Sequence, residues 1–314
     1  MPLTRKEFLD IAGSGAVGAV GRSAFGSSGS AEPMATREGE GSFKAGERPF
    51  SYMATAVVFG GQMTEPHADL LDVQGATVLP PSGGHGSARV ANYRYGQIDK
   101  RRYVQIVSIG SANSEVFGSQ KDGSYETLTT VTVEDLSIAD DRVKAGLIVA
   151  QLISIRTPGT KEPPFRHTTS TIKGLYIDDQ EIVLDPDQKL DNDDCSRFTA
   201  AVKHYDEIVH PKTVKLGLGP TQALIASRKD GDPFPDVMLQ MSIFEKAKLK
   251  DGAKLKLGAK PGQCSIEADG LRVSLGELEI TSQSRRLTML RVTLGPNLGG
   301  ELVAASVEGD GRDP

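Results

Sequence analysis

Alternation between apolar and polar side chains constrains the fold of this chain more than any other feature. Val, Ile, Thr, Leu and aromatic residues recur at every second position, and Gly, Pro, Asn or Asp interrupts each run. A period of two is typical of strands that bury one face and expose the other. The segments that carry it are 52–59, 88–95, 103–109, 126–138, 143–155, 168–184, 235–244, 263–280, 286–294 and 301–307.

Most of these expected strands follow one another without a helical segment between them, which favours antiparallel pairing over a parallel α/β sheet. One stretch differs, because the apolar residues between Phe198 and Ile208 fall on one helical face and Pro211 follows them. The 35 glycines and the 5% aromatic content predict many turns and an aliphatic core. We therefore expect an all-β fold, an antiparallel β-sandwich or barrel-like body, with one inserted amphipathic helix.

The first residues are typical of an export signal. Thr4-Arg5-Lys6-Glu7-Phe8-Leu9-Asp10 and the weakly apolar segment after it resemble a twin-arginine signal with Lys in place of the second Arg. Glycines 13, 15 and 18 also spell G-x-G-x-x-G, but no strand–helix alternation follows to build a dinucleotide-binding fold. We expect an extracytoplasmic protein, whether periplasmic, on the cell surface or secreted.

The domain organisation expected from these patterns has five parts. They are an export signal at 1–31, a flexible tether at 32–48, a first β half at 49–190, a linking helix at 191–211 and a second β half at 212–314. The formal net charge of -5 predicts no general attraction to nucleic acid. No run in the sequence approaches the roughly 20 apolar residues of a transmembrane helix.

Two segments repeat each other. Residues 129–138 align without gaps to residues 168–177, and Asp-Asp lies close after each. In both, the apolar phase changes, at Glu134-Asp135 and at Lys173-Gly174. An extra residue in a strand has this effect, so we expect a β-bulge in each of two equivalent strands.

Five stretches carry a resemblance to known proteins. They are 88–95, 108–118, 128–153 with its Val-Glu-Asp-Leu-Ser-Ile core, 171–187 and 286–295. In content and order they resemble a group of uncharacterised bacterial exported β-rich proteins and, more distantly, secreted proteins labelled choice-of-anchor. The resemblance covers much of the chain between about Ala88 and Gly309 and implies a secreted β architecture. It implies no catalytic residue and no ligand.

Acidic residues crowd the loop before the expected helix. Asp185, Asp187, Asp191 and Asp193 supply hard oxygen ligands of the kind that hold calcium, although the EF-hand pattern is absent. The alternative, which we favour, is that they cap the helix and solvate the loop. The five histidines show no zinc spacing, and no phosphate-binding loop occurs in the sequence. Calcium is therefore the one cofactor with any support, and we expect none.

Lysines alternate through residues 246–257. A three-residue loop at 250–252 would pair Lys248 with Lys254 and Lys246 with Lys256, and would place all four on one face of a hairpin. Like charges opposite one another are unfavourable unless water, nearby acids or an anionic ligand counters them. One hypothesis is a site for an acidic polysaccharide or another envelope polyanion. The other, which we favour, is an edge hairpin whose lysines prevent aggregation.

We thus expect an exported structural or interaction protein of the cell envelope or extracellular space. The sequence motifs favour such a protein over an enzyme. Its expected partners are further copies through β-edges, or a polyanion. The alternative is an extracytoplasmic hydrolase that acts on a carbohydrate or ester, with carboxylates in a cleft between the β halves. Cys195 and Cys264 form no C-x-x-C, and a disulfide and two buried thiols are equally compatible with the sequence.

Overall fold

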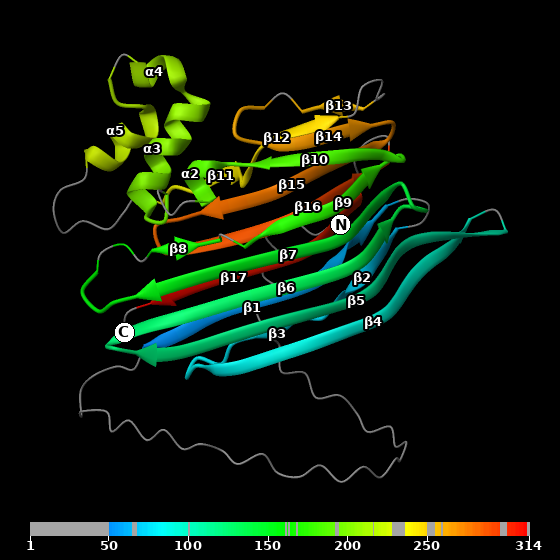
Figure 1. Cartoon of the computed structure of the whole chain (residues 1–314), viewed down its shortest axis with the longest axis horizontal. Helices are drawn as coiled ribbons and strands as arrows, with labels where there is room; N and C mark the ends of the chain where they lie inside the picture. Colours follow the sequence, from blue (N-terminus) through cyan, green and yellow to red (C-terminus); the bar gives the residue numbers. More distant parts are fainter. Residues whose placement is uncertain are drawn as a thin grey trace, which may run out of the picture. The chain divides into compact units, whose positions relative to one another are not determined.

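Two antiparallel β-sheets face each other across an apolar core, as Figure 1 shows. The computed structural model describes residues 50–64, 68–99, 101–160, 162, 164–167, 169–191, 195–215, 217–227, 236–249, 255–258, 260–295 and 300–312. All of them belong to the unit Phe50–Asp313. The predicted all-β sandwich is confirmed. The expected export signal and tether lie outside the described residues.

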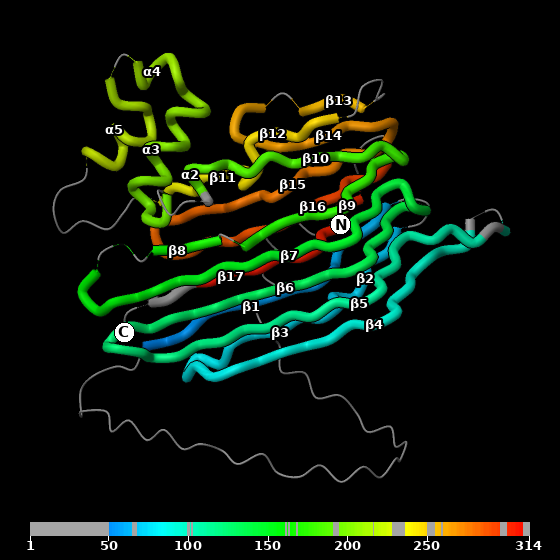
Figure 2. Tube along the Cα trace, in the orientation of Figure 1, coloured from blue at the N-terminus to red at the C-terminus, as the bar shows by residue number. Residues whose placement is uncertain are grey.

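The first sheet, sheet A, has the strand order β13-β14-β15-β16-β17-β1-β2, with β11 beside β15 and β3 beside β1. Its strands are β1 Ser51–Met63, β2 Asp69–Gln74, β3 Thr77–Val78, β11 Leu239–Ser242, β13 Lys256–Leu257, β14 Cys264–Ala268, β15 Leu271–Ile280, β16 Ser284–Leu294 and β17 Gly300–Arg312. The first and last strands of the unit, β1 and β17, pair along their length, as the tube in Figure 2 shows.

The second sheet, sheet B, has the order β12-β10-β9-β7-β6-β5-β4, with β8 beside β7. Its strands are β4 Gly84–Asp99, β5 Arg102–Lys121, β6 Ser124–Ile138, β7 Val143–Arg156, β8 Phe165–Arg166, β9 Thr171–Ile177, β10 Gln180–Pro186 and β12 Phe244–Leu249. Valines, isoleucines and leucines that alternate along both sheets fill the core between them.

The helical segment lies between β10 and β11 in the sequence. The predicted amphipathic helix is α3, Phe198–Val209, which buries Phe198, Ala201 and Val202. Three shorter described helices accompany it: α2 Gln188–Asp191, α4 Pro211–Lys215 and α5 Pro220–Ala226. The expected halves on either side of this segment are not separate bodies. Sheet A combines β1–β3 with strands that follow the helices, and sheet B takes β12 from the later part of the chain.

A line of unusual backbone crosses sheet B. Asn92 of β4, Asp135 of β6 and Gly174 of β9 have φ values of 51°, 53° and 61°, and Gly110 of β5 and Gly146 of β7 lie opposite them. At each of these positions two consecutive residues of the strand face away from the core, and the alternation then resumes with its phase shifted.

The predicted phase change is therefore correct, but the predicted extra residue is wrong. The β5–β6 register runs unbroken from Ser111↔Glu134 to Ile109↔Leu136, and the β7–β9 register is equally continuous. A bulge would place two residues opposite one. Here, neighbouring strands shift phase at the same line. Each left-handed residue lies opposite one residue of the next strand, and neither strand contains an extra residue.

Sheet A has a corresponding line. It is formed by the left-handed residues Gly75, Ala305 and Gly276, with Val58 and Met289 between them. There the consecutive pair faces the core, and Ala304 and Ala305 are both buried. Because the core lies on opposite sides of the two sheets, the paired side chains of both lines point in the same direction. The inward–outward alternation thus shifts in the same direction in both sheets, and the core between them is continuous.

Candidate functional site

The lysine-rich segment does not form the predicted hairpin. Strand β12 pairs with β10 in sheet B, whereas β13 pairs with β14 in sheet A. Lys246 lies opposite Asp185 and Lys256 lies opposite Glu267, and Lys254 is outside the described residues. The prediction assumed pairing within the segment, but Phe244 and Ala247 of β12 are buried in the core of the sandwich. Burial of these apolar side chains outweighs the local turn.

Acidic side chains counter two of the candidate lysines. Lys246 Nζ lies 2.8 Å from Glu245 Oε1, and Lys248 Nζ lies 2.7 Å from Asp185 Oδ2. Both lysine side chains remain more than 60% exposed, so water screens these ion pairs. Their charge is compensated within the chain, and polyanion binding at Lys246, Lys248, Lys254 and Lys256 stays a prediction.

The four candidate calcium ligands do not converge in the described part of the chain. Asp185 contacts Lys248, while Asp187 Oδ1 accepts hydrogen bonds from the backbone N–H groups of Lys189 (3.0 Å) and Leu190 (3.3 Å) at the start of α2. The side chains of Asp191 and Asp193 lie outside the described residues. No group of three or more metal-binding side chains occurs among those described. Asp187 thus caps α2, a helix that the sequence did not predict. The N-cap of the predicted helix α3 is Arg197, which makes no side-chain capping hydrogen bond.

A buried polar cluster lies where the helical segment meets the sheets. We define it as His167, Asp187, His204 and Arg285, all of which are less than a tenth exposed. His204 Nε2 donates to Asp187 Oδ2 over 2.7 Å. Arg285 Nη2 donates to the carbonyl oxygens of Cys195 (2.9 Å) and Ser196 (2.8 Å), just before α3.

Burial sets the charge states in this cluster. Desolvation, reinforced by the nearby Arg285 cation, lowers the pKa of His167 to about 4, so His167 is neutral at pH 7. Burial lowers the pKa of Arg285 to about 10, so it keeps its charge. Burial raises the pKa of Asp187, but hydrogen bonds from His204 and from the α2 amides outweigh this effect, and the pKa is lowered overall. The cluster anchors the helical segment, because one cation from β16 binds the chain that leads into α3.

The sequence analysis missed Arg285 and His167. Arg285 occupies the inward phase of β16 together with Leu287 and Met289. A charged residue at an inward position of an alternating strand was the available indication, but the expected strand began one residue later. His167 gave no such pattern, because it follows the two-residue strand β8.

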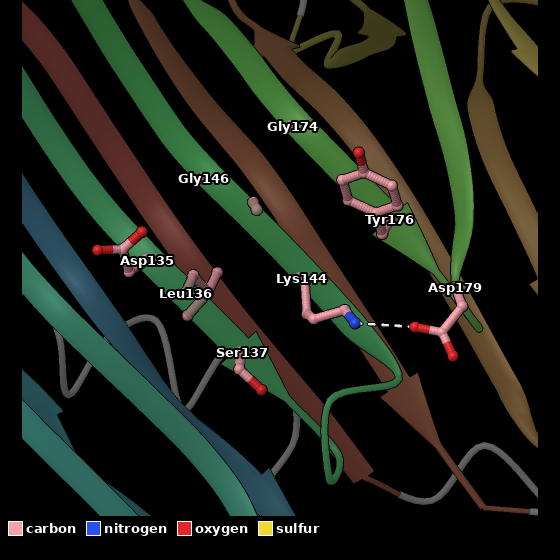
Figure 3. Close-up of a pocket in the computed structure, with 9 residues that line it drawn as sticks. Asp135, Leu136, Ser137, Lys144, Gly146, Gly174, Tyr176 and Asp179 are labelled. Carbon is pink, nitrogen blue, oxygen red and sulfur yellow. Dashed lines mark hydrogen bonds and ion pairs between the residues drawn. The ribbon is translucent and has the colours of Figure 1, made fainter.

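A second polar site is an open hollow on the outer face of sheet B, shown in Figure 3. Its volume is about 570 Å³. Gly146 of β7 and Gly174 of β9 lie opposite each other and leave this space without side chains. The lining side chains come from β6, β7, β9 and the turn after β9; those used below are Asp135, Ser137, Lys144, Tyr176 and Asp179. We call this site the sheet-B hollow.

An ion pair and a hydrogen bond lie at the sheet-B hollow. Lys144 Nζ lies 2.8 Å from Asp179 Oδ1, and the Ser137 hydroxyl contacts Asp141. The Asp179 carboxylate raises the pKa of Lys144 through this hydrogen bond. The Tyr176 side chain is 36% exposed. The sequence analysis identified both repeated segments beside the hollow, β6 and β9, but not that β7 pairs with each of them and brings Gly146 between them.

The two cysteines are buried thiols, not a disulfide. Burial raises the pKa of Cys264 to about 11 and keeps it protonated at neutral pH. Among the described helices, none combines the length and apolar character needed to span a bilayer.

Comparison with known proteins gives one match. No curated protein and no solved structure matches the chain, and nothing links it to choice-of-anchor proteins. A family model described as "Domain of unknown function (DUF8256)" matches residues 50–227. This range contains β1–β10 and all four described helices, including the sheet-B hollow. Since the match covers more than half of the sequence, the chain belongs to the DUF8256 family of domains of unknown function.

Proposed function

We propose that this protein is an exported, non-enzymatic interaction protein that pairs with a second copy of itself through the edge strand β4. The observation that carries the proposal is the length and position of this strand. β4 has 16 residues and stands last in the order of sheet B, paired with β5 on one side. Among the described strands, none pairs with its other side. Backbone N–H and C=O groups along such an edge pair readily with another strand.

The other described edges are less suited to pairing. At the opposite end of sheet B, β12 has six residues and carries Lys246 and Lys248. In sheet A, β13 has two residues, and the β2–β3 edge is interrupted at Gly75. Short strands, lysines and irregular backbone are devices that protect an edge. β4 is regular over most of its length, apart from Asn92 and a bulge at Tyr95/Gly96.

The geometry gives less support to the hydrolase alternative. The described groups with large pKa shifts toward neutrality, His167, Arg285 and Cys264, are buried, and so is the Asp187–His204 pair. A general acid or base must come within hydrogen-bond reach of its substrate. In the buried cluster, Asp187 instead contacts His204, and Arg285 contacts the carbonyl oxygens that precede α3.

The association test uses two adjacent proline substitutions, Ser87→Pro and Ala88→Pro. Successive N–H groups of a strand point to opposite sides, so one substitution removes a hydrogen bond to β5 and the other removes an outward donor. We expect sedimentation velocity on the full chain to show a concentration-dependent dimer. The proline that replaces the outward donor should weaken dimerisation while the thermal unfolding midpoint changes little.

Two results would overturn the association proposal. One is a wild-type chain that sediments as a monomer at every concentration up to the highest that stays in solution. The other is a dimer that both proline variants form with unchanged affinity. If the dimer is lost only together with the fold, charge reversal at the exposed edge residue Arg89, by Arg89→Glu, provides a variant that keeps every backbone donor.

Export is tested separately by fractionating cells that produce the full chain. Lys6→Arg completes the twin-arginine pair and should keep or increase the extracytoplasmic fraction. Arg5→Lys is the matched control, and it should retain the chain inside the cell. Equal distribution of wild type and both variants would contradict export through this segment.

A further inference from the structure

Charged side chains have different surroundings on the outer faces of the two sheets. On sheet A, Arg291 of β16 contacts Glu277 of β15 and Glu301 of β17, and Arg286 likewise lies between Glu279 and Glu308. Each of these arginines is enclosed by acids from both neighbouring strands. On sheet B, the sheet-B hollow interrupts the outer face. Its polar groups surround an open space rather than only one another.

We propose that the sheet-B hollow is a binding site for a neutral saccharide. This inference is independent of the β4 edge, because β6, β7 and β9 supply the site. The volume of about 570 Å³ falls within the range of small-molecule sites, about 300–1,000 Å³. The hollow is open along the sheet face, so a chain of sugar units can continue beyond its walls.

The floor of the hollow is built to stay open. Gly174 has a φ of 61°, which side chains rarely adopt, so the pleat change of β9 favours glycine there. At Gly146 a Cβ atom would meet only the carbonyl oxygen of Lys173, at 3.6 Å. The backbone there tolerates a side chain, and the absence of one leaves room over the sheet.

The walls match the chemistry of a sugar ring. Tyr176 offers an aromatic surface for the C–H face of a pyranose, and a half-exposed ring loses little conformational freedom when it is covered. The Asp135 and Asp179 carboxylates accept hydrogen bonds from sugar hydroxyls, and the Lys144 ammonium donates to ring or hydroxyl oxygens. Figure 3 shows Lys144 and Asp179, a donor and an acceptor, next to each other beside the Tyr176 ring.

Charge selects the class of saccharide. The wall residues named above include two carboxylates and one ammonium group, and the ammonium is paired with Asp179. An acidic polysaccharide would bring further negative charge next to Asp135 and Asp179, which costs free energy. The ligand is therefore neutral. The polyanion predicted for the lysine-rich segment would bind elsewhere.

The test is affinity electrophoresis of the full chain in native gels that contain dextran, galactomannan, xyloglucan or polygalacturonate. We expect at least one neutral polysaccharide to retard the wild-type chain, and polygalacturonate not to do so. Tyr176→Ala should weaken binding about tenfold, because it removes the stacking surface. Gly146→Leu should abolish binding, because its side chain fills the hollow.

The matched control is Phe117→Ala, which removes an exposed ring from β5 of the same sheet, outside the hollow. It should leave retardation unchanged, and circular dichroism should show that all three variants keep the β fold. The proposal is wrong if no neutral polysaccharide retards the chain, if polygalacturonate does so instead, or if Tyr176→Ala and Phe117→Ala behave alike. None of these results bears on dimerisation through β4, which sedimentation velocity measures without any saccharide.

Discussion

The two lateral sides of the sandwich differ in whether their polar groups are buried or exposed to water. On the side of the helical segment, Arg285 and the Asp187–His204 pair are removed from water and held by hydrogen bonds. The buried His167 ring lies beside them, and neither of its nitrogens has a hydrogen-bond partner among the described residues. On the β4 side, the polar groups of the backbone remain at the edge of the sheet. Buried polar groups are costly unless every contact is kept, so the first side fixes one arrangement of the chain. The second side leaves its hydrogen bonds to water or to a partner.

This difference separates stability from association. Substitutions in the buried cluster should change the free energy of unfolding and leave β4 pairing unchanged in the folded protein. Substitutions at the outward side of β4 should do the reverse.

The largest expected effect is that of Arg285→Ala. The substitution removes the Nη2 donor from the carbonyl oxygens of Cys195 and Ser196, of which Ser196 keeps the Phe165 N–H at 2.9 Å. It also opens a cavity beside Phe165, whose ring centre lies 5.2 Å from the guanidinium carbon. We expect a loss of about 3–5 kcal/mol in the free energy of unfolding, measured with urea.

Arg272→Ala is the control for this loss. Arg272 pairs with an acid, Glu267, but both side chains are more than 40% exposed. It should cost less than about 1 kcal/mol. Equal losses for the two arginines would show that Arg285 does not anchor the helical segment, and the comparison between the two sides would fail.

A smaller effect is expected from the acid dependence that His167 creates. Its pKa is about 4 in the folded chain and 6.5 for an ordinary histidine. Between these values the unfolded chain binds more protons, so stability is complete above pH 6.5 and is lost as the pH falls toward 4. The full loss amounts to about 3 kcal/mol.

His167→Phe should remove this acid dependence while it keeps a ring in the same place. The measurement is the unfolding free energy at several pH values between 4 and 7. His85→Phe serves as the matched variant, because His85 is exposed on β4. It should keep the wild-type pH profile, and a profile that His167→Phe leaves unchanged would show that His167 is not the buried titrating group.

The sequence could predict the strands and their sheet class, because alternation depends on the same burial that forms the core. It also located the phase changes at Asp135 and Gly174. It could not show that Asn92, Gly110 and Gly146 join the same line, since the register between strands brings them together. For the same reason it predicted bulges where the structure has a matched shift.

The candidate sites were harder to predict, because each depends on pairing between distant segments. The hairpin predicted for the lysine-rich segment is wrong, because β12 and β13 belong to different sheets. Asp187 does cap a helix, but this helix is the short α2 and not the predicted α3, whose N-cap is Arg197. The buried cluster combines residues from β16, α3 and two loops, and sequence patterns alone do not bring such residues together.

The smallest expected effects concern the lysines of β12, at the end of sheet B opposite β4. Lys248 is exposed and paired with Asp185, so Lys248→Gln should change the free energy of unfolding by less than about 1 kcal/mol. The polyanion hypothesis makes a sharper statement about the same pair. An anionic ligand must compete with Asp185 for Lys248. Removal of the lysine charge should therefore weaken polyanion binding, and removal of the aspartate charge should strengthen it.

Elution of the full chain from immobilised heparin measures this shift. If the lysines bind polyanions, Lys248→Gln should elute at lower salt than the wild type, and Asp185→Asn should elute at higher salt, because each removed or released cation changes the number of displaced counterions. Elution of all three chains at the same salt concentration would exclude the polyanion site. The lysines would then remain as protection of a short edge, and the contrast with the longer β4 edge, for which we propose pairing, would become sharper.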